Sequence, residues 1–285
     1  MSKRYTTFIR KYTMQVKTYT SFFLLSLISV NSIYSQVNTD GFYPGKQNGS
    51  IALSFSYENF NTFYLGSGEL ADFSGNYITT GISAYAVYGI TDDLAASLSI
   101  PYIHINALEM GEQGLQDLSI NAKYKLVKVD AEKINISISP ALGFSFPVTN
   151  YLLSDFGIGQ QATGFDARII VHMKTNSNFF AEMQGGGLLR FDPAPGGFVF
   201  LAKTGYAGNK IYADVSYALQ KINEGQDLET PSVNLKALGI SYQKINATIA
   251  HNIHGFSVYA SGGYVLDGEN IGKAIRVGGG ILYRF

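Results

Sequence analysis

RVGGGILYRF, residues 276–285, ends the chain and decides how the rest of it is interpreted. In an extended strand, successive side chains point to opposite faces. Counted back from Phe285 to Val277, every second residue is apolar, aromatic or glycine. Arg284 and Arg276 fall on the other face. The stretch therefore predicts an amphipathic last strand with one greasy face and one charged face.

The same alternation recurs from residue 50 onward. It is clearest in residues 117–126, where Leu118, Ile120 and Tyr124 oppose Asp117 and Lys123. Period-two alternation over such lengths indicates half-buried strands. The pattern predicts twelve strands, over residues 50–57, 78–89, 94–103, 117–126, 134–146, 165–174, 179–190, 198–206, 211–220, 233–242, 256–266 and 273–285.

Strand number and connection length favour a closed antiparallel transmembrane β-barrel over residues 49–285. Twelve is an even number, and many of the strands approach the roughly 9–11 residues that cross a bilayer at a tilt. Tight connections such as residues 91–93 and 176–178 alternate with longer ones such as 59–76 and 147–163, as periplasmic turns and outer loops do. One stretch, Asn246 to His254, is interpreted as an extended turn. A soluble β-sandwich is the rival architecture, but it rarely runs to twelve such strands.

Composition agrees with an all-β chain. The sequence has 285 residues with 31 Gly, 20 Tyr and 19 Phe, and only 15% of its residues are charged. Glycine with aromatic residues suits many strands joined by turns. There is no apolar run of 18 residues, so a helical membrane protein is excluded on length. Zero Cys removes disulfides and thiolate chemistry.

The N-terminus has the pattern of a signal peptide over residues 1–35. Five basic residues precede a ten-residue apolar run at 21–30, and Ser35 provides a small residue before the cleavage point. A start at Met14 would give a more ordinary signal peptide. Residues 36–48 then form a polar lead-in that we expect in the periplasm.

Export leaves a mature chain with 16 basic and 21 acidic groups, since all five basic residues of the segment are lost and no acidic one. A nucleic-acid partner would require a basic surface, so none is expected. A terminal Phe on an amphipathic strand is the ending that outer-membrane barrels present to their insertion machinery. The predicted partners are therefore outer-membrane lipid, that machinery through Phe285, and a small solute.

Several motifs carry a family resemblance. YGITDDLAASLSIPY (residues 88–102), GLQDL (114–118) followed by KY (123–124), and DGEN (267–270) resemble the outer-membrane transporter family named for the meta-pathway of phenol degradation. The resemblance implies a bacterial outer-membrane barrel that moves small, often hydrophobic or aromatic, compounds. Its motifs are structural, and no catalytic residues come with it.

The polar strand faces supply the predicted lumen lining. Charges that faced lipid would cost about 2–4 kcal/mol each near the midplane for Arg or Lys. The functional interpretation is a mixed electrostatic lining that filters solutes, and the alternative is that the charges pair and fill a narrow barrel. The lining set is Glu58, Asp117, Lys123, Lys125, Asp166, Arg168, His172, Glu182, Arg190, Lys203, Asp214, Arg276 and Arg284.

Other functions were weighed against transport. A barrel hydrolase would need a histidine beside a nucleophile and a carboxylate. Only His172 points inward at mid-strand, and its own strand offers it no carboxylate. No catalytic, cofactor or metal site is predicted. Aromatic residues in the predicted outer loops, Phe60 and Tyr151 among them, would also suit an adhesive barrel or a plug. The sequence is interpreted as a monomeric outer-membrane channel that passively admits small solutes.

Overall fold

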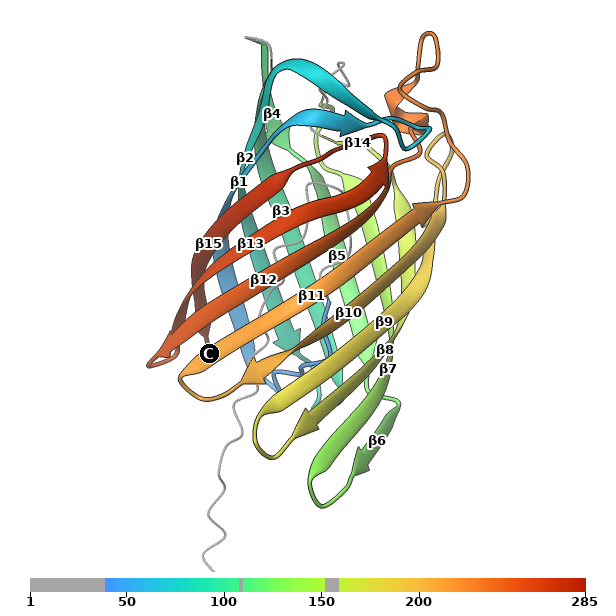
Figure 1. Cartoon of the computed structure of the whole chain (residues 1–285). Coiled ribbons are helices and arrows are strands. Elements are labelled where there is room, and N and C mark those ends of the chain that lie inside the picture. Colours follow the sequence, from blue (N-terminus) through green and yellow to red (C-terminus); the bar gives the residue numbers. More distant parts are fainter. Residues whose placement is uncertain (1–38, 108–109, 152–158) are drawn as a thin grey trace, which may run out of the picture.

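The computed structural model describes residues 39–107, 110–151 and 159–285. The predicted signal peptide and residues 36–38 of the lead-in lie outside the described residues. Within them, no helix is long and apolar enough to cross a membrane. Figure 1 shows tilted strands that wrap into a barrel, with short connections at one end and longer ones at the other. These ends are called the turn end and the loop end below.

Twelve long strands of the described chain build the wall, and each pairs antiparallel with its sequence neighbours. Three short strands prolong them: β4 (Met110–Leu115) precedes β5, β6 (Val127–Asp130) follows β5, and β14 (Ile271–Gly272) precedes β15. The predicted closed twelve-stranded antiparallel barrel is confirmed. The long strands are β1 (Gly49–Tyr64), β2 (Leu70–Gly89), β3 (Leu94–Ala107), β5 (Asp117–Tyr124), β7 (Ile134–Pro147), β8 (Gly164–Thr175), β9 (Phe179–Arg190), β10 (Gly197–Ala207), β11 (Ile211–Ile222), β12 (Ser241–Ile253), β13 (Phe256–Glu269) and β15 (Ile275–Arg284).

The barrel closes where its first strand meets its last. β1 pairs with β15 in continuous register from Ser50 opposite Arg284 to Asn59 opposite Ile275. Two backbone hydrogen bonds between Gly49 and Phe285, of 2.9 and 3.0 Å, complete the seam. A closed sheet satisfies its backbone groups within itself, which a sheet in hydrocarbon must do.

Side-chain alternation separates the two faces of the wall. On β1, Leu53 and Phe55 are each 52% exposed, whereas Ser54 and Ser56 on the opposite face are 7% exposed. On β15, Ile281 and Tyr283 are exposed while Leu282 between them is buried. The outside is therefore apolar and the inside small or polar, the reverse of a water-soluble protein.

The structure corrects the region from residue 233 to residue 254. The predicted strand 233–242 and extended turn 246–254 are wrong, because Ser241–Ile253 forms β12. Lys244 and Thr248 face inward while Ile245 and Ile249 face outward. The turn is only His254-Gly255, with φ of 45° and 86°. Two left-handed residues make the two-residue hairpin turn whose twist matches its strands.

Several connections are also shorter than predicted. β1 and β2 continue to Tyr64 and back to Leu70, and residues 104–107 and 110–114 form a β3–β4 ladder instead of a loop. The strands thus run past the length that a bilayer requires. The β11–β12 connection is longer than predicted, since it spans residues 223–240 and contains a short 3₁₀ helix, η1 (Leu235–Ala237).

Candidate functional site

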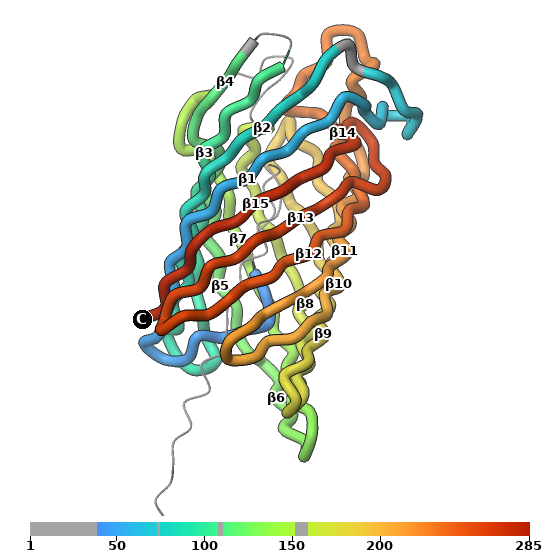
Figure 2. Tube along the Cα trace, turned by 60° about the vertical axis from the view of Figure 1, so that its left-hand side comes forward, coloured from blue at the N-terminus to red at the C-terminus, as the bar shows by residue number. Residues whose placement is uncertain are grey.

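The interior of the barrel is the candidate site, and part of the predicted periplasmic lead-in lies inside it. Residues 39–44, here called the N-terminal segment, run inside the barrel near the turn end (Figure 2). Side chains of the barrel interior hydrogen-bond to them. Phe42 is fully buried, and Asp40 and Tyr43 are nearly so. Charged side chains on the inner face of the barrel bind this segment there, whereas in the periplasm only solvent would surround it.

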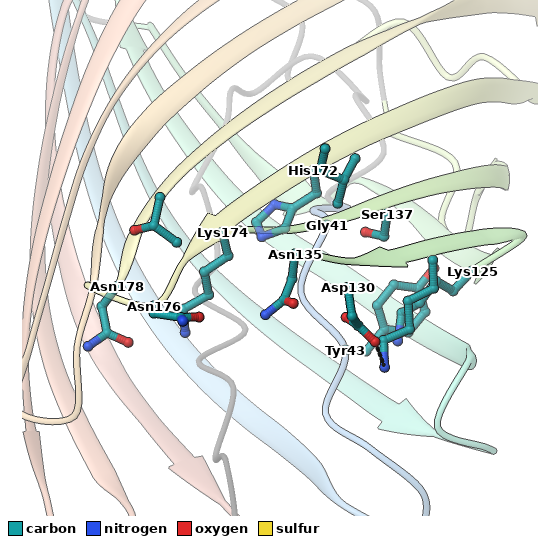
Figure 3. A pocket seen from close by; sticks show the side chains of 13 residues that line it. Gly41, Tyr43, Lys125, Asp130, Asn135, Ser137, His172, Lys174, Asn176 and Asn178 are labelled. Atoms are coloured by element: carbon teal, nitrogen blue, oxygen red, sulfur yellow. Dashed lines mark ion pairs between the residues drawn. The ribbon is translucent and has the colours of Figure 1, made fainter. Parts of the chain in front are cut away.

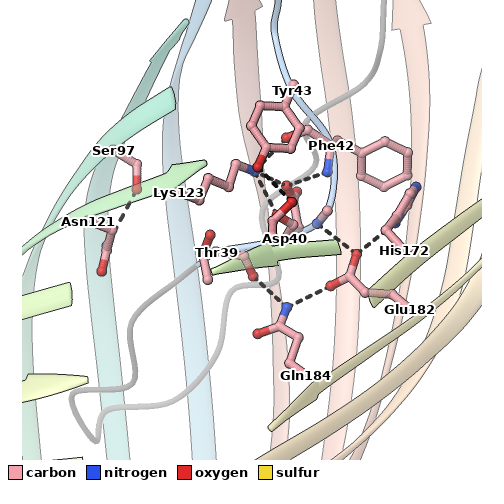
Figure 4. A network of polar contacts seen from close by, with 12 residues as sticks. Thr39, Asp40, Phe42, Tyr43, Ser97, Asn121, Lys123, His172, Glu182 and Gln184 are labelled. Carbon is pink, nitrogen blue, oxygen red and sulfur yellow. Dashed lines mark hydrogen bonds and ion pairs between the residues drawn. The ribbon is translucent and has the colours of Figure 1, made fainter. Parts of the chain in front are cut away.

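Lys123 on β5 holds the segment from one side. Its ammonium donates to the Asp40 carbonyl at 2.6 Å, to Asp40 Oδ1 at 2.9 Å and to the Phe42 carbonyl (Figure 4). An ammonium has three donors, and all three are used. Lys123 is 6% exposed, so the pair with Asp40 is a buried one whose geometry compensates for desolvation.

Glu182 on β9 holds the segment from the opposite side. Its Oε2 accepts the Gly41 amide at 2.8 Å and lies 3.1 Å from His172 Nδ1. Gln184 donates to Glu182 Oε1 at 2.6 Å and to the Thr39 carbonyl at 2.9 Å. The backbone of the segment is thus fixed by side chains of two strands, β5 and β9, as Figure 4 shows.

Aromatic packing completes the attachment. The Phe42 ring lies edge-on to His172 at 4.5 Å and to Phe180 at 5.1 Å between ring centroids. Tyr43 donates its hydroxyl to Ser139 at 2.8 Å. Burial raises the pKa of Tyr43 to about 12, so the hydroxyl keeps its proton as a donor. The segment is anchored by both polar and apolar contacts.

The thirteen predicted lining residues divide by burial. Eight are buried: Asp117, Lys123, Asp166, Arg168, His172, Glu182, Lys203 and Asp214. The other five are half-buried: Glu58, Lys125, Arg190, Arg276 and Arg284. All eight buried residues lie on β5, β8, β9, β10 and β11, whose interior faces we call the charged wall.

Some of these charges pair with one another. Arg168 forms a fork to Asp166, with Nε to Oδ1 at 2.6 Å and Nη2 to Oδ2 at 2.5 Å. Such bidentate pairs are strong and geometrically specific. Lys203 lies 3.9 Å from Glu182. Arg168 and Asp166 lie on one strand, and Lys203 lies opposite Glu182 on the neighbouring strand, so neither pair crosses the interior. The alternative in which charges pair across the interior stays a prediction.

The interior faces of β1, β2, β13 and β15 form a second wall, here called the Gly–Ser wall. Cross-strand rows such as Ser56–Gly278–Ser261 run along it. Its charges are few: Glu58 lies directly opposite Arg276 in the β1–β15 ladder, and Lys244 on neighbouring β12 lies 4.3 Å over the Tyr242 ring. Lys244 was missed from sequence because it fell between a predicted strand and a predicted turn.

The loop end is covered on one side by the β11–β12 connection. Asn270 donates to Asp227 at 3.0 Å and to the Gly239 carbonyl at 2.8 Å, which ties this connection to the turn between β13 and β14. An apolar cluster lies beneath it, with Phe60, Tyr64, Leu238, Ile240, Tyr242, Val265, Ile271 and Ala274 buried. Phe60 and Tyr64 thus belong to β1 and its interior, not to an outer loop.

Tyr151, from the β7–β8 connection, turns inward. Its hydroxyl donates to Asp117 at 3.0 Å and accepts the Gln161 amide at 2.8 Å. Burial, with the Asp117 carboxylate beside it, raises the pKa of Tyr151 above its ordinary value. The phenol therefore stays a donor and narrows the lumen near the loop end.

His172 has the carboxylate that its own strand did not offer, since Glu182 comes from the next strand. Ser137 lies opposite His172 in the β7–β8 ladder. His172 Nε2, however, has no hydrogen-bond partner among the described residues, so no hydroxyl is positioned for activation. Nor does any group of three or more His, Asp or Glu in residues 39–107, 110–151 and 159–285 gather to hold a metal ion.

Comparison with known proteins supports the fold. No protein family and no curated protein sequence matches the chain. An outer membrane channel from Pseudomonas putida F1 superimposes with a TM-score of 0.71 at 12% identity, covering 88% of this chain and 100% of that one. KdgM porin, alone and in complex with disordered oligogalacturonate, gives 0.44 and 0.48 at 11% and 10% identity, covering 81% and 82% of this chain and 99% of each. The fold assignment rests on the first, and the fold is that of a closed β-barrel of the outer-membrane type.

Proposed function

We propose that the protein is a channel of the bacterial outer membrane that passively admits small solutes. One observation carries the proposal: a closed barrel has an apolar outside and an inside of charges, serine and glycine. This reversed polarity suits a wall between hydrocarbon and an aqueous path. The C-terminal strand that ends at Phe285 would serve recognition by the insertion machinery.

The difference between the two interior walls supports a solute path that runs along one side of the lumen. The N-terminal segment is attached to the charged wall through Lys123 and Glu182. The Gly–Ser wall has small side chains and half-buried Glu58, Gly278 and Arg276. The solute would pass between this wall and the segment, where the charges filter it.

Solute chemistry follows from the loop end and from the sequence motifs. The apolar cluster at that end and the resemblance of residues 88–102 to the phenol meta-pathway transporters both support compounds with a hydrophobic or aromatic part. Charges deeper in the lumen would then select for a polar or charged group on the same compound.

Conductance of the purified protein in planar lipid bilayers tests the proposal, with liposome swelling as a second measure of flux. Folding is checked by heat-modifiable gel mobility. We expect discrete conductance steps and swelling in small solutes. A folded barrel with neither conductance nor flux would instead indicate a structural or adhesive role.

Hydrolysis is the runner-up, because Ser137, His172 and Glu182 lie in one row across β7, β8 and β9. We propose that this row is structural. Glu182 is engaged by the Gly41 amide, and Phe42 packs on the imidazole. Phospholipid and ester hydrolysis by the folded protein should therefore stay at the level of a Ser137→Ala variant.

A further inference from the structure

A cavity of about 270 Å³ lies at the turn end, between the N-terminal segment and strands β6 to β8. Gly41 and Tyr43 form one side of it, and inward-facing side chains of β7 and β8 form another (Figure 3). With about 30 Å³ for one water in the liquid, it holds on the order of nine waters or one small organic molecule.

Four of its side chains form a block in the β7–β8 ladder. Asn135 is directly opposite Lys174, and Ser137 is directly opposite His172. Directly opposed residues have Cβ atoms about 4.5–5.5 Å apart, so all four can reach one ligand. Their polar groups are an ammonium, an amide, a hydroxyl and an imidazole.

Of the three lysines that line this cavity, two have a carboxylate partner and one does not, so the cavity carries one uncompensated positive charge. Lys125 pairs with Asp93 at 3.2 Å, and Lys128 pairs with Asp130 at 3.0 Å. Lys174 has neither an ion pair nor a side-chain hydrogen bond within the part of the chain described. An ammonium left without a carboxylate in a half-buried site favours an anion from outside.

His172 adds an independent indication of a ligand. It is 5% exposed, its Nδ1 is held by Glu182, and its buried Nε2 lacks a partner in residues 39–107, 110–151 and 159–285. Buried polar atoms are nearly always satisfied in folded proteins. Figure 3 shows His172, Lys174 and Asn135 side by side on the cavity wall.

We propose that this cavity binds a small organic monocarboxylate at the inner mouth of the channel. Lys174 neutralises the carboxylate, Asn135 donates a hydrogen bond to it, and the Tyr43 ring contacts its apolar part. His172 donates to it from Nε2 in the form that carries a proton on both ring nitrogens, with Nδ1 donating to Glu182. One unpaired ammonium matches one negative charge, and a doubly charged anion would leave a second negative charge in a cavity that Asp130 also lines. The proposal rests on the proposed channel function and names the class of solute that it would pass.

Binding of sodium benzoate to the detergent-folded barrel, measured by calorimetry, tests the site without conductance. Lys174→Gln should weaken binding by about ten-fold or more, because a charge-assisted contact is lost. Lys133→Gln is the matched control, since Lys133 lies in the adjacent turn outside the cavity lining and carries the same charge. Inorganic phosphate should bind more weakly than benzoate.

Three results would overturn the assignment: no benzoate binding by the folded wild-type protein, equal loss in both lysine variants, or tighter binding of phosphate. Conductance of the same preparations separates this inference from the channel proposal. A conducting protein that does not bind benzoate refutes the site alone. A protein that binds benzoate but never conducts keeps the site and refutes the channel.

Discussion

The strands of the charged wall and of the Gly–Ser wall both carry apolar side chains on the outer face of the barrel. Their inner faces differ, because one is charged and the other carries mainly small residues. On the charged wall, Lys123 and Glu182 are buried and bind the backbone of the N-terminal segment. On the Gly–Ser wall, rows such as Ser56–Gly278–Ser261 present little side-chain volume and few partners. The second wall meets the N-terminal segment near the turn end, where Tyr43 packs against Val87, but it supplies none of these charged contacts to the segment's backbone.

The difference shows how a barrel of twelve strands divides its lumen. Charges can be buried where a backbone segment supplies carbonyl and amide partners, because unpaired buried charges are costly. Along the Gly–Ser wall, glycine and serine take up little volume and so leave space in the lumen. We therefore propose separate tasks for the two walls, attachment of the segment on one side and passage of the solute on the other.

Releasing the segment should have the largest effect on this comparison. Lys123→Met removes all three donors that bind Asp40 and Phe42, so the segment should leave the charged wall. We expect single-channel conductance to rise by about two-fold or more, since the lumen widens. Unchanged conductance from a folded Lys123→Met barrel would mean that the segment does not restrict the path.

A smaller change at the same place should act in the same direction. Gly41→Ala would press a Cβ against the His172 ring and displace the segment locally. The expected rise in conductance is about half that of Lys123→Met, because the lysine contacts remain. Gly111→Ala is the control, since nothing lies closer than 3.5 Å to its added Cβ.

Filling the Gly–Ser wall should have the opposite sign. Ser261→Phe adds a ring inside the lumen opposite Gly278, and we expect conductance to fall by about half. Ala260→Phe puts the same ring on the exposed outer face and should leave conductance at the wild-type value. Equal single-channel currents from the two variants would mean that the ions do not pass along the Gly–Ser wall.

The smallest expected effect concerns the charges of the Gly–Ser side. Arg276→Gln removes a half-buried cation opposite Glu58, so the preference for anions should fall. The reversal potential under a salt gradient should shift toward cation preference at low ionic strength. At about 1 M salt the shift should vanish, because the Debye length is then only about 3 Å.

The sequence predicts the strands of the barrel better than it predicts the contacts inside the lumen. Alternation located most strands, because period two is a local property of the strand. The thirteen residues that it assigned to the lumen lining stay a prediction. The failure at residues 241–253 has a local cause too. Lys244, Asn246 and Thr248 make the inner face of β12 so polar that it resembles a turn.

No pattern in the sequence indicated the contacts that the N-terminal segment and His172 make inside the lumen. Asp40 meets Lys123 across 83 residues, and Gly41 meets Glu182 across 141. Residues 39–44 have no periodicity of their own that would indicate burial. Likewise, His172 obtained its carboxylate from a neighbouring strand, which depends on the β8–β9 register.

The sequence by itself determined that this chain forms amphipathic strands with charges on one face, because side-chain alternation follows from backbone geometry alone. Only the tertiary structure decided which charges meet, since ladder register and barrel closure place residues from distant strands in one row. It alone also placed the N-terminal segment, whose burial depends on partners that exist only after the barrel has closed.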